Sequence, residues 1–237
     1  YRRIDERDAS GIDYIFSWSG NTDLVIGIIK LIEDAMNAEE DILTGGVQAI
    51  LLVEDSVRFY STYLPALYKL ILQQNTEFLK DAFNEQMLRK RGRPKILLAT
   101  NYADAVALYE RYKKNLLGVI SDVGFVLHKG DSPSTEKLDA GIDLCRLVRA
   151  DNPLMPVLLQ SSQTAFAAQA RELGAGFIAK NSKTLLQELS DFIAARFAFG
   201  DFLFKDLSTG RVIGRAKDLH EMQRLVASVP DDVFEYN

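Results

Sequence analysis

The chain has 237 residues, 47% of them hydrophobic, and a formal net charge of −5. This length and composition allow one or two globular domains, each with a buried core. The acidic balance argues against a general nucleic-acid binder, because the surface of such a protein is usually strongly basic.

The cysteine content and the hydropathy pattern indicate a cytoplasmic protein. Cys145 is the only cysteine, so no internal disulfide can form, and its apolar surroundings GIDLCRLV favour a place in the core. The most apolar helical segment, Leu24 to Ile32, contains Lys30 and is too short and too charged to span a bilayer. No signal peptide is recognisable. Because the sequence begins with Tyr1, we expect a piece of a longer protein.

A strand and a helix are predicted in the N-terminal part. Residues 11–18 (GIDYIFSW) have a strand-like pattern, and Asn21 or Thr22 is a suitable cap for the helix that follows. A Thr-Gly-Gly break over residues 44–46 ends this helix. A single strand and helix cannot close a core, so residues 1–45 are predicted to be the remnant of a preceding domain. The apolar positions of the helix have helical spacing and are Val25, Ile28, Ile29, Ile32 and Met36.

From residue 46 onward, strands and helices alternate regularly. The strands are almost continuously apolar, which is typical of a parallel sheet covered by helices on both faces. The pattern therefore predicts an α/β fold with a five-stranded, doubly wound parallel sheet. The strands are predicted at 48–54, 95–100, 116–121, 156–160 and 176–179, and the helical segments at 56–89, 102–115, 140–150, 163–173 and 182–197.

Two connections are longer than such a sheet needs. Residues 56–90 predict two helices, separated by a polar break at QQNT (73–76), with Pro65 kinking the first. Residues 123–139 predict a loop that hangs over the carboxyl edge of the sheet. After the sheet, residues 199–237 predict a hairpin with its turn at 208–210, followed by a helix.

Charged and hydroxyl residues stand at the carboxyl ends of four predicted strands. In open α/β sheets, ligands bind at these ends, where the strand order changes direction. An acid pair, a lone acid, a hydroxyl and a lysine would therefore meet in one crevice. Phosphoryl transfer to an aspartate needs such a set, since it depends on positioning and on charge neutralisation. The residues are Glu54, Asp55, Asp122, Ser161 and Lys180.

Each of these residues also has a simpler explanation when it is taken alone. Asp55 precedes the helix predicted from Ser56, where an acid caps the helix and favours its dipole. Ser161 could cap the next helix, and Lys180 could be a surface charge. Capping does not readily account for all five together in this order, which favours a common site.

Residues 46–198 resemble the receiver domain of two-component response regulators, the CheY-like family. The resemblance rests on VEDS after the first strand, SD at the end of the third, Ser161 five positions after Pro156, and Lys180 at the end of the fifth. It implies a flavodoxin-like fold with strand order 2-1-3-4-5. It also implies phosphorelay signal transduction, with no catalysis beyond the domain's own phosphorylation and dephosphorylation.

The resemblance assigns a role to each acid of the crevice. Asp122 would be the phosphoacceptor. Mg²⁺ would be held by Glu54, Asp55 and Asp122, together with the backbone carbonyl of Gly124. These are the oxygen ligands that Mg²⁺ prefers. Without the metal, the three carboxylates would repel one another, so we expect a destabilised acidic pocket.

The remaining roles concern the phosphoryl group and the partners. Lys180 would pair with a phosphoryl oxygen, Ser161 would hydrogen-bond another, and Phe177 would reorient with Ser161 as a switch. The donor would be a histidine kinase, a phosphotransfer protein or a small phosphodonor, and the target an attached output domain. A homodimer is a further option, whereas no nucleic acid and no membrane are expected as partners.

Departures from the receiver pattern keep two alternatives open. Asn181 follows Lys180 where receivers usually have a proline, and the loop after Asp122 is enlarged. Both favour a non-phosphorylated pseudo-receiver that serves as an interaction or dimerisation module. A small phosphatase with an aspartyl nucleophile would need a second acid two positions after Asp122. Gly124 stands there, which argues against this class.

A second resemblance concerns the whole chain. The segments that carry it are LRKRGRPKILLA (88–99), LGVISDVGF (117–125), VLLQSSQ (157–163), FGDFLFKD (199–206) and SVPDDVFEYN (228–237). By these segments the chain resembles the receiver-containing region ahead of the catalytic part of phosphoenolpyruvate synthase or pyruvate phosphate dikinase. Residues 1–45 resemble the last strand and helix of another, degenerate receiver, because GIDYIFSW and its helix mirror GAGFIAK and its helix, with Ser17 or Trp18 where lysine is expected. Residues 199–237 would link to a missing C-terminal part. The basic run LRKRGRPK (88–95) could bind phosphate or nucleic acid, but a solvated connection is favoured, because no aromatic residues interleave with it.

Overall fold

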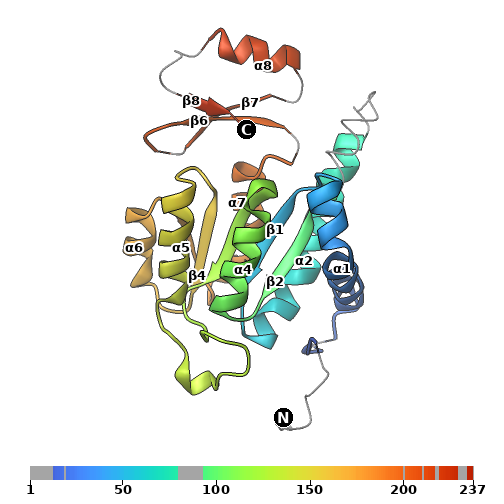
Figure 1. The fold of residues 1–237 in the computed structure, drawn as a ribbon, viewed down its shortest axis with the longest axis vertical. Helices are drawn as coiled ribbons and strands as arrows, with labels where there is room; N and C mark the ends of the chain where they lie inside the picture. The colour runs from blue at the N-terminus through green and yellow to red at the C-terminus, as the bar shows by residue number, and fades with distance from the viewer. Residues whose placement is uncertain are drawn as a thin grey trace.

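The computed structural model describes residues 13–18, 20–79, 93–199, 201–209, 211–216, 219–228 and 234–236. A parallel sheet with helices on both faces forms the main body, and a smaller antiparallel sheet lies beyond one end of it (Figure 1). Within the described residues, none of the helices is long and apolar enough to cross a membrane.

The central sheet has the order β2-β1-β3-β4-β5, and every neighbouring pair is parallel. This confirms the predicted fold class. The chain leaves β1 for β2 on one side and then returns to β3 on the other, so the strand order changes direction at β1. The strands are β1 (Ala49–Val53), β2 (Lys95–Ala99), β3 (Leu116–Asp122), β4 (Val157–Ser161) and β5 (Gly176–Ala179).

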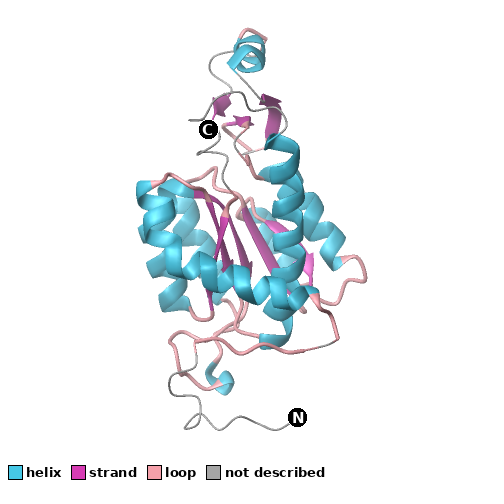
Figure 2. Ribbon diagram, turned by 90° about the vertical axis from the view of Figure 1, so that its right-hand side faces the viewer, coloured by secondary structure: helices cyan, strands magenta, loops and turns pink. Residues whose placement is uncertain are grey.

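Helices cover both faces of this sheet (Figure 2). Alternate residues of a strand point to opposite faces, so one strand serves two cores. Leu51 of β1 packs in the core with α4, α5 and α6, whereas Leu52 packs in the core with α2 and α7. These helices are α2 (Val57–Leu79), α4 (Tyr102–Tyr112), α5 (Ala140–Asp151), α6 (Phe166–Glu172) and α7 (Leu185–Arg196); short helical turns η3 (Lys113–Asn115) and η4 (Pro133–Thr135) lie between them.

The predicted break within residues 56–89 is wrong. Helix α2 runs without interruption through residues 73–76 and contains Pro65. Glutamine has a high helix propensity, so a polar run of this kind can continue an exposed helix. The second helix predicted in this connection lies largely in residues 80–92, outside the described residues.

The strand predicted at 11–18 is also wrong for the described residues 13–18, which form no strand. They are bound to α2 instead, because Ser17 N–H donates to Ser61 Oγ at 2.9 Å and the Tyr60 hydroxyl donates to the Ile15 carbonyl. Helix α1 (Asp23–Ala38) follows and continues into the π-helical turn η2 (Glu39–Thr44). Asn21 caps α1, since its side chain accepts a hydrogen bond from Asp23 N–H at 2.9 Å.

A buried carboxylate attaches α1 to the edge of the sheet. Asp34 is fully buried and accepts hydrogen bonds from the Tyr68 hydroxyl (2.8 Å), from Arg93 Nη1 (2.9 Å) and from the N–H of Ile96 in β2 (2.9 Å). The described end of the predicted basic run is thus engaged in internal pairing, because Lys95 also pairs with α1 and η2. Residues 88–92 of that run lie outside the described residues.

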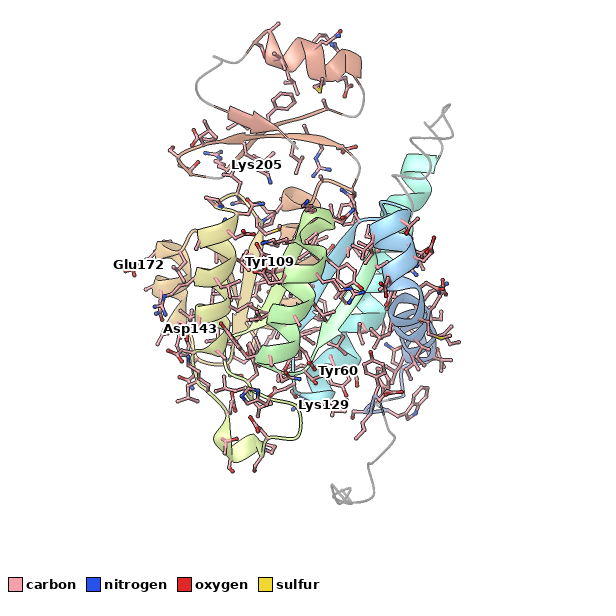
Figure 3. The ribbon with its side chains drawn as sticks, in the orientation of Figure 1. Tyr60, Tyr109, Lys129, Asp143, Glu172 and Lys205 are labelled. Atoms are coloured by element: carbon pink, nitrogen blue, oxygen red, sulfur yellow. The ribbon has the colours of Figure 1, made fainter. Side chains whose placement is uncertain are left out.

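The C-terminal part contains the predicted hairpin and helix. Strands β6 (Phe202–Asp206) and β7 (Val212–Ala216) pair antiparallel, and α8 (Leu219–Val226) follows. A third strand, β8 (Phe234–Tyr236), pairs with the other side of β6 and was not predicted. Lys205 lies between this sheet and the α/β body (Figure 3), where its ammonium donates to the Leu154 carbonyl at 3.3 Å.

Candidate functional site

The sheet register brings the predicted site residues to one edge. Asp122 is the last residue of β3 and Ser161 the last of β4, while Glu54 and Lys180 follow β1 and β5 at once. Val53 pairs with Ser121, Asp122 with Gln160, and Ser161 with Ala179. Because these strands are parallel and in register, their carboxyl ends are level with one another.

Lys180 lies at the centre of the charged groups. Its ammonium donates to Glu54 Oε1 at 3.0 Å, lies 2.7 Å from Glu54 Oε2, and forms an ion pair with Asp122. It also lies 4.3 Å from the centre of the Phe59 ring, where a cation–π attraction adds to the pairing. The Lys180 side chain thus reaches the acids although Asn181 follows it.

The three acids form a compact oxygen cluster. One carboxylate oxygen from each of Glu54, Asp55 and Asp122 lies within 4.8 Å of the others. The pKa of Glu54 is raised to about 8, first by burial and then by the charge of Asp122, against the opposite effect of Lys180. The pKa of Asp55 is raised to about 6, first by burial and then by repulsion from Asp122 and Glu136. The negative charge of the cluster therefore exceeds what Lys180 alone neutralises.

Main-chain groups orient each of these acids. Glu54 Oε1 accepts from Ser56 N–H at 3.1 Å, and Asp122 Oδ1 accepts from Val123 N–H at 2.7 Å. Hydrogen bonding from the backbone of Val126 lowers the pKa of Asp55, against the effect of burial. The carbonyl of Ser56 accepts from Tyr60 N–H at 3.1 Å, so Ser56 rather than Asp55 is the N-cap residue of α2.

Ser161 and Phe177 differ in their relation to the site. Ser161 lines the pocket, and its Oγ accepts from Gln163 N–H at 3.1 Å at the start of the connection to α6. Phe177 is half-buried and packs against the core beneath α4, α5 and α6. The structure thus places Ser161 next to the acids and Phe177 in the neighbouring core, and their coupling as a switch stays a prediction.

The site opens into a pocket of about 230 Å³. Asp122, Gly124 and Lys180 are among the residues that line it. Phe59 and Glu136 also line it, and neither was singled out from the sequence. Glu136 belongs to the enlarged loop, which was expected over the crevice, but no spacing rule identifies which residue of a long loop turns inward.

The loop over residues 123–139 is attached to the body at several points. Phe125 and Lys137 form an antiparallel bridge, with N–H to carbonyl distances of 3.3 and 3.1 Å. At the start of α4, the N–H groups of Tyr102 and Ala103 donate to the loop carbonyls of residues 126 and 127, both at 3.0 Å. The loop lies at the end of the sheet opposite to the three-stranded sheet (Figure 1).

No protein-family model and no curated protein matches the chain. Among solved structures, it is similar to a response regulator receiver domain protein from Clostridium thermocellum (19% identity, 62% of this chain and 91% of that chain, TM-score 0.37). It is also similar to the receiver domain of NtrX from Brucella abortus (20% identity, 61% and 98%, TM-score 0.37). A third is the Mn²⁺-bound form of the response regulator Rcp1 (17% identity, 62% and 92%, TM-score 0.35).

Proposed function

We propose that this chain contains a phosphoaccepting receiver domain, in which Asp122 takes up a phosphoryl group in a Mg²⁺-dependent reaction. The observation that carries the proposal is the position of the Lys180 ammonium between Glu54 and Asp122, beside a cluster of three carboxylates. A cation placed next to an acid at a strand end is what transfer of a phosphoryl group to that acid requires.

The proposed reaction is a displacement at phosphorus by an oxygen of Asp122. The new bond joins this oxygen to phosphorus, and the bond from phosphorus to the donor's leaving group breaks, with its electron pair departing on that group. Lys180 would then pair with a phosphoryl oxygen. Ser161 Oγ, which lines the same pocket, would donate a hydrogen bond to another.

The acidic cluster fits a hard divalent cation. Carboxylate and carbonyl oxygens are the ligands that Mg²⁺ prefers, and Glu54, Asp55, Asp122 and the carbonyl of Gly124 would hold it. Lys180 carries one positive charge against the three carboxylates of the cluster, and the bound cation would supply the remaining positive charge. Glu54 and Asp55 would release protons on binding, because burial raises the pKa of both.

A receiver domain needs a phosphodonor and an output protein that responds to its phosphorylation. A histidine kinase, a phosphotransfer protein or a small phosphodonor in the cytoplasm would supply the phosphoryl group. The output would be an attached or separate protein, with a phosphoenolpyruvate synthase-like enzyme as one candidate.

A second candidate function is that of an interaction module, including a homodimer. Helix α1 favours it, because this one element exposes several large apolar side chains, and clustered exposure of this kind marks interaction surfaces more often than scattered exposure does. The exposed residues are Val25, Ile26, Ile29, Ile32 and Met36.

Binding of beryllofluoride, an analogue of the phosphoryl group, tests the proposed function. We expect the wild type to bind it at one site in the presence of Mg²⁺, as detected by ¹⁹F NMR, and Asp122→Asn to lose this binding. Asp191→Asn, on the exposed side of α7, is the matched control and should bind normally. If the wild type does not bind beryllofluoride, the interaction module takes the place of the phosphoacceptor.

A further inference from the structure

Glu136 occupies the place that a side chain of residue 124 would fill. A Cβ atom built on Gly124 would come 2.3 Å from Glu136 Oε1, and the next closest group would be the carboxyl carbon of the same side chain at 3.3 Å. Gly124 follows Asp122 by two residues. The carboxylate of Glu136 therefore lies where the side chain of an acid at position 124 would lie, although residue 124 itself is a glycine.

The position of Glu136 is set by the main chain around it. Lys137, the next residue, forms the antiparallel bridge with Phe125, the residue after Gly124. The ammonium of Lys137 is directed to α5, where it pairs with Asp143. Glu136 lines the same pocket as Asp122 and Lys180, and its charge acts on Asp55.

Hydrolysis of a phosphorylated aspartate needs a base close to the attacking water. Phosphatases with an aspartyl nucleophile require a second acid two positions after the nucleophile, and Gly124 was the reason to set this chemistry aside. The carboxylate of Glu136 supplies the missing acid from the loop. A positioned general base typically contributes roughly 10²- to 10⁴-fold to a rate.

We propose that Glu136 is the general base that hydrolyses the phosphorylated Asp122, so that the domain limits the lifetime of its own phosphorylated state. This inference rests on the proposed function. The oxygen of a water molecule bonds to phosphorus, and the water proton passes to Glu136. The bond from phosphorus to the Asp122 oxygen breaks, and its electron pair restores the Asp122 carboxylate. Inorganic phosphate leaves, and Glu136 returns its proton to solvent.

The test compares phosphoryl lifetimes in the wild type, Glu136→Gln, Glu136→Ala and the control Glu172→Gln, an exposed glutamate on α6. Each protein is incubated with acetyl phosphate at saturating Mg²⁺, and the affinity for Mg²⁺ is measured separately for each. Loss of the phosphoryl group is followed by intact mass and by release of inorganic phosphate.

We expect Glu136→Gln to keep its phosphoryl group about 100-fold longer than the wild type and the control. Added formate should restore part of the hydrolysis in Glu136→Ala, which a merely structural role of Glu136 would not explain. A second result would support the proposal equally. In it, the wild type releases inorganic phosphate without accumulating the phosphorylated form, whereas Glu136→Gln accumulates that form.

Equal lifetimes in the wild type and Glu136→Gln would overturn the role of Glu136 and leave phosphorylation of Asp122 intact. A different result would reject both proposals together: neither protein gains a phosphoryl group, and neither releases phosphate above the rate of the donor alone.

Discussion

The ammonium of Lys180 lies 2.7 Å from Oε2 of Glu54, although 126 positions separate the two residues in the sequence. The parallel sheet accounts for this meeting, because it aligns the carboxyl ends of β1 and β5 with β3 and β4 between them. Both side chains are buried, so the interaction is little screened by solvent.

Lys180→Ala should destabilise the metal-free protein. The substitution leaves Glu54 and Asp122 close together without their cation, and breaking a buried pair costs about 3 to 5 kcal/mol. Protonation of the acids will reduce this loss, so we expect a decrease of about 2 kcal/mol or more in the free energy of unfolding in EDTA. Urea denaturation measures it, and Mg²⁺ should recover part of the loss. Lys113→Ala, which removes an exposed pair, should have an effect below about 1 kcal/mol.

The stability of the metal-free protein should fall as pH rises from about 4.5 to about 8. Burial raises the pKa of Glu54 in the folded state, so the folded protein binds more protons than the unfolded chain in this window, and raising the pH removes that stabilisation. The limiting slope for one such group is about 1.4 kcal/mol per pH unit. Denaturation of the wild type and Glu54→Gln at several pH values isolates this contribution. If the free energy of unfolding depends on pH with the same slope in the wild type and in Glu54→Gln, the raised pKa of Glu54 is contradicted.

Asp34→Asn should be strongly destabilising, although Asp34 does not line the acidic pocket. Its buried carboxylate pairs with Arg93 and accepts the N–H of Ile96, so the neutral amide would leave the guanidinium with only the longer pair to Glu33 at 3.6 Å. We expect a loss of about 3 kcal/mol in the free energy of unfolding. Asp23→Asn, at an exposed acid in the first turn of the same helix, is the control and should change it by less than about 1 kcal/mol. Similar values for the two variants would show that Asp34 does not hold α1 to the sheet.

Gly124→Ala should displace Glu136 while preserving the fold. The added methyl group meets the far end of a flexible side chain, which can move away, rather than fixed backbone. We therefore expect a stability close to that of the wild type and a longer phosphoryl lifetime, as in Glu136→Gln. Circular dichroism and intact mass measure the two effects. A lifetime equal to that of the wild type would mean that Glu136 does not act from the position next to Gly124.

The sequence was sufficient to predict the five-stranded sheet and the meeting of Asp122 with Lys180. Both depend on apolar strands followed directly by charged residues, which is a local pattern. The role of Asp34 could not be predicted in this way, because its partners lie on α2 and at the edge of β2. Glu136 was missed for a related reason: the fold of a long loop is set by contacts such as the bridge from Phe125 to Lys137, which leave no periodic signal.

The strand expected at 11–18 shows a limit of the same kind. An apolar and aromatic segment satisfies a strand pattern, but residues 13–18 have no neighbouring strand to pair with in the described part of the chain. Their hydrogen bonds go to side chains of α2, Tyr60 and Ser61. Local pattern alone does not distinguish these two outcomes.

Intact mass after incubation with acetyl phosphate and Mg²⁺ tests the central claim most directly. The comparison is between the wild type and Asp122→Asn, with Glu136→Gln included so that rapid hydrolysis does not hide the product. The account predicts a single phosphoryl increment that is present with Asp122, disappears in Asp122→Asn and requires the metal. It is contradicted if Glu136→Gln and the wild type both keep their original mass and release no phosphate, or if Asp122→Asn gains the same increment.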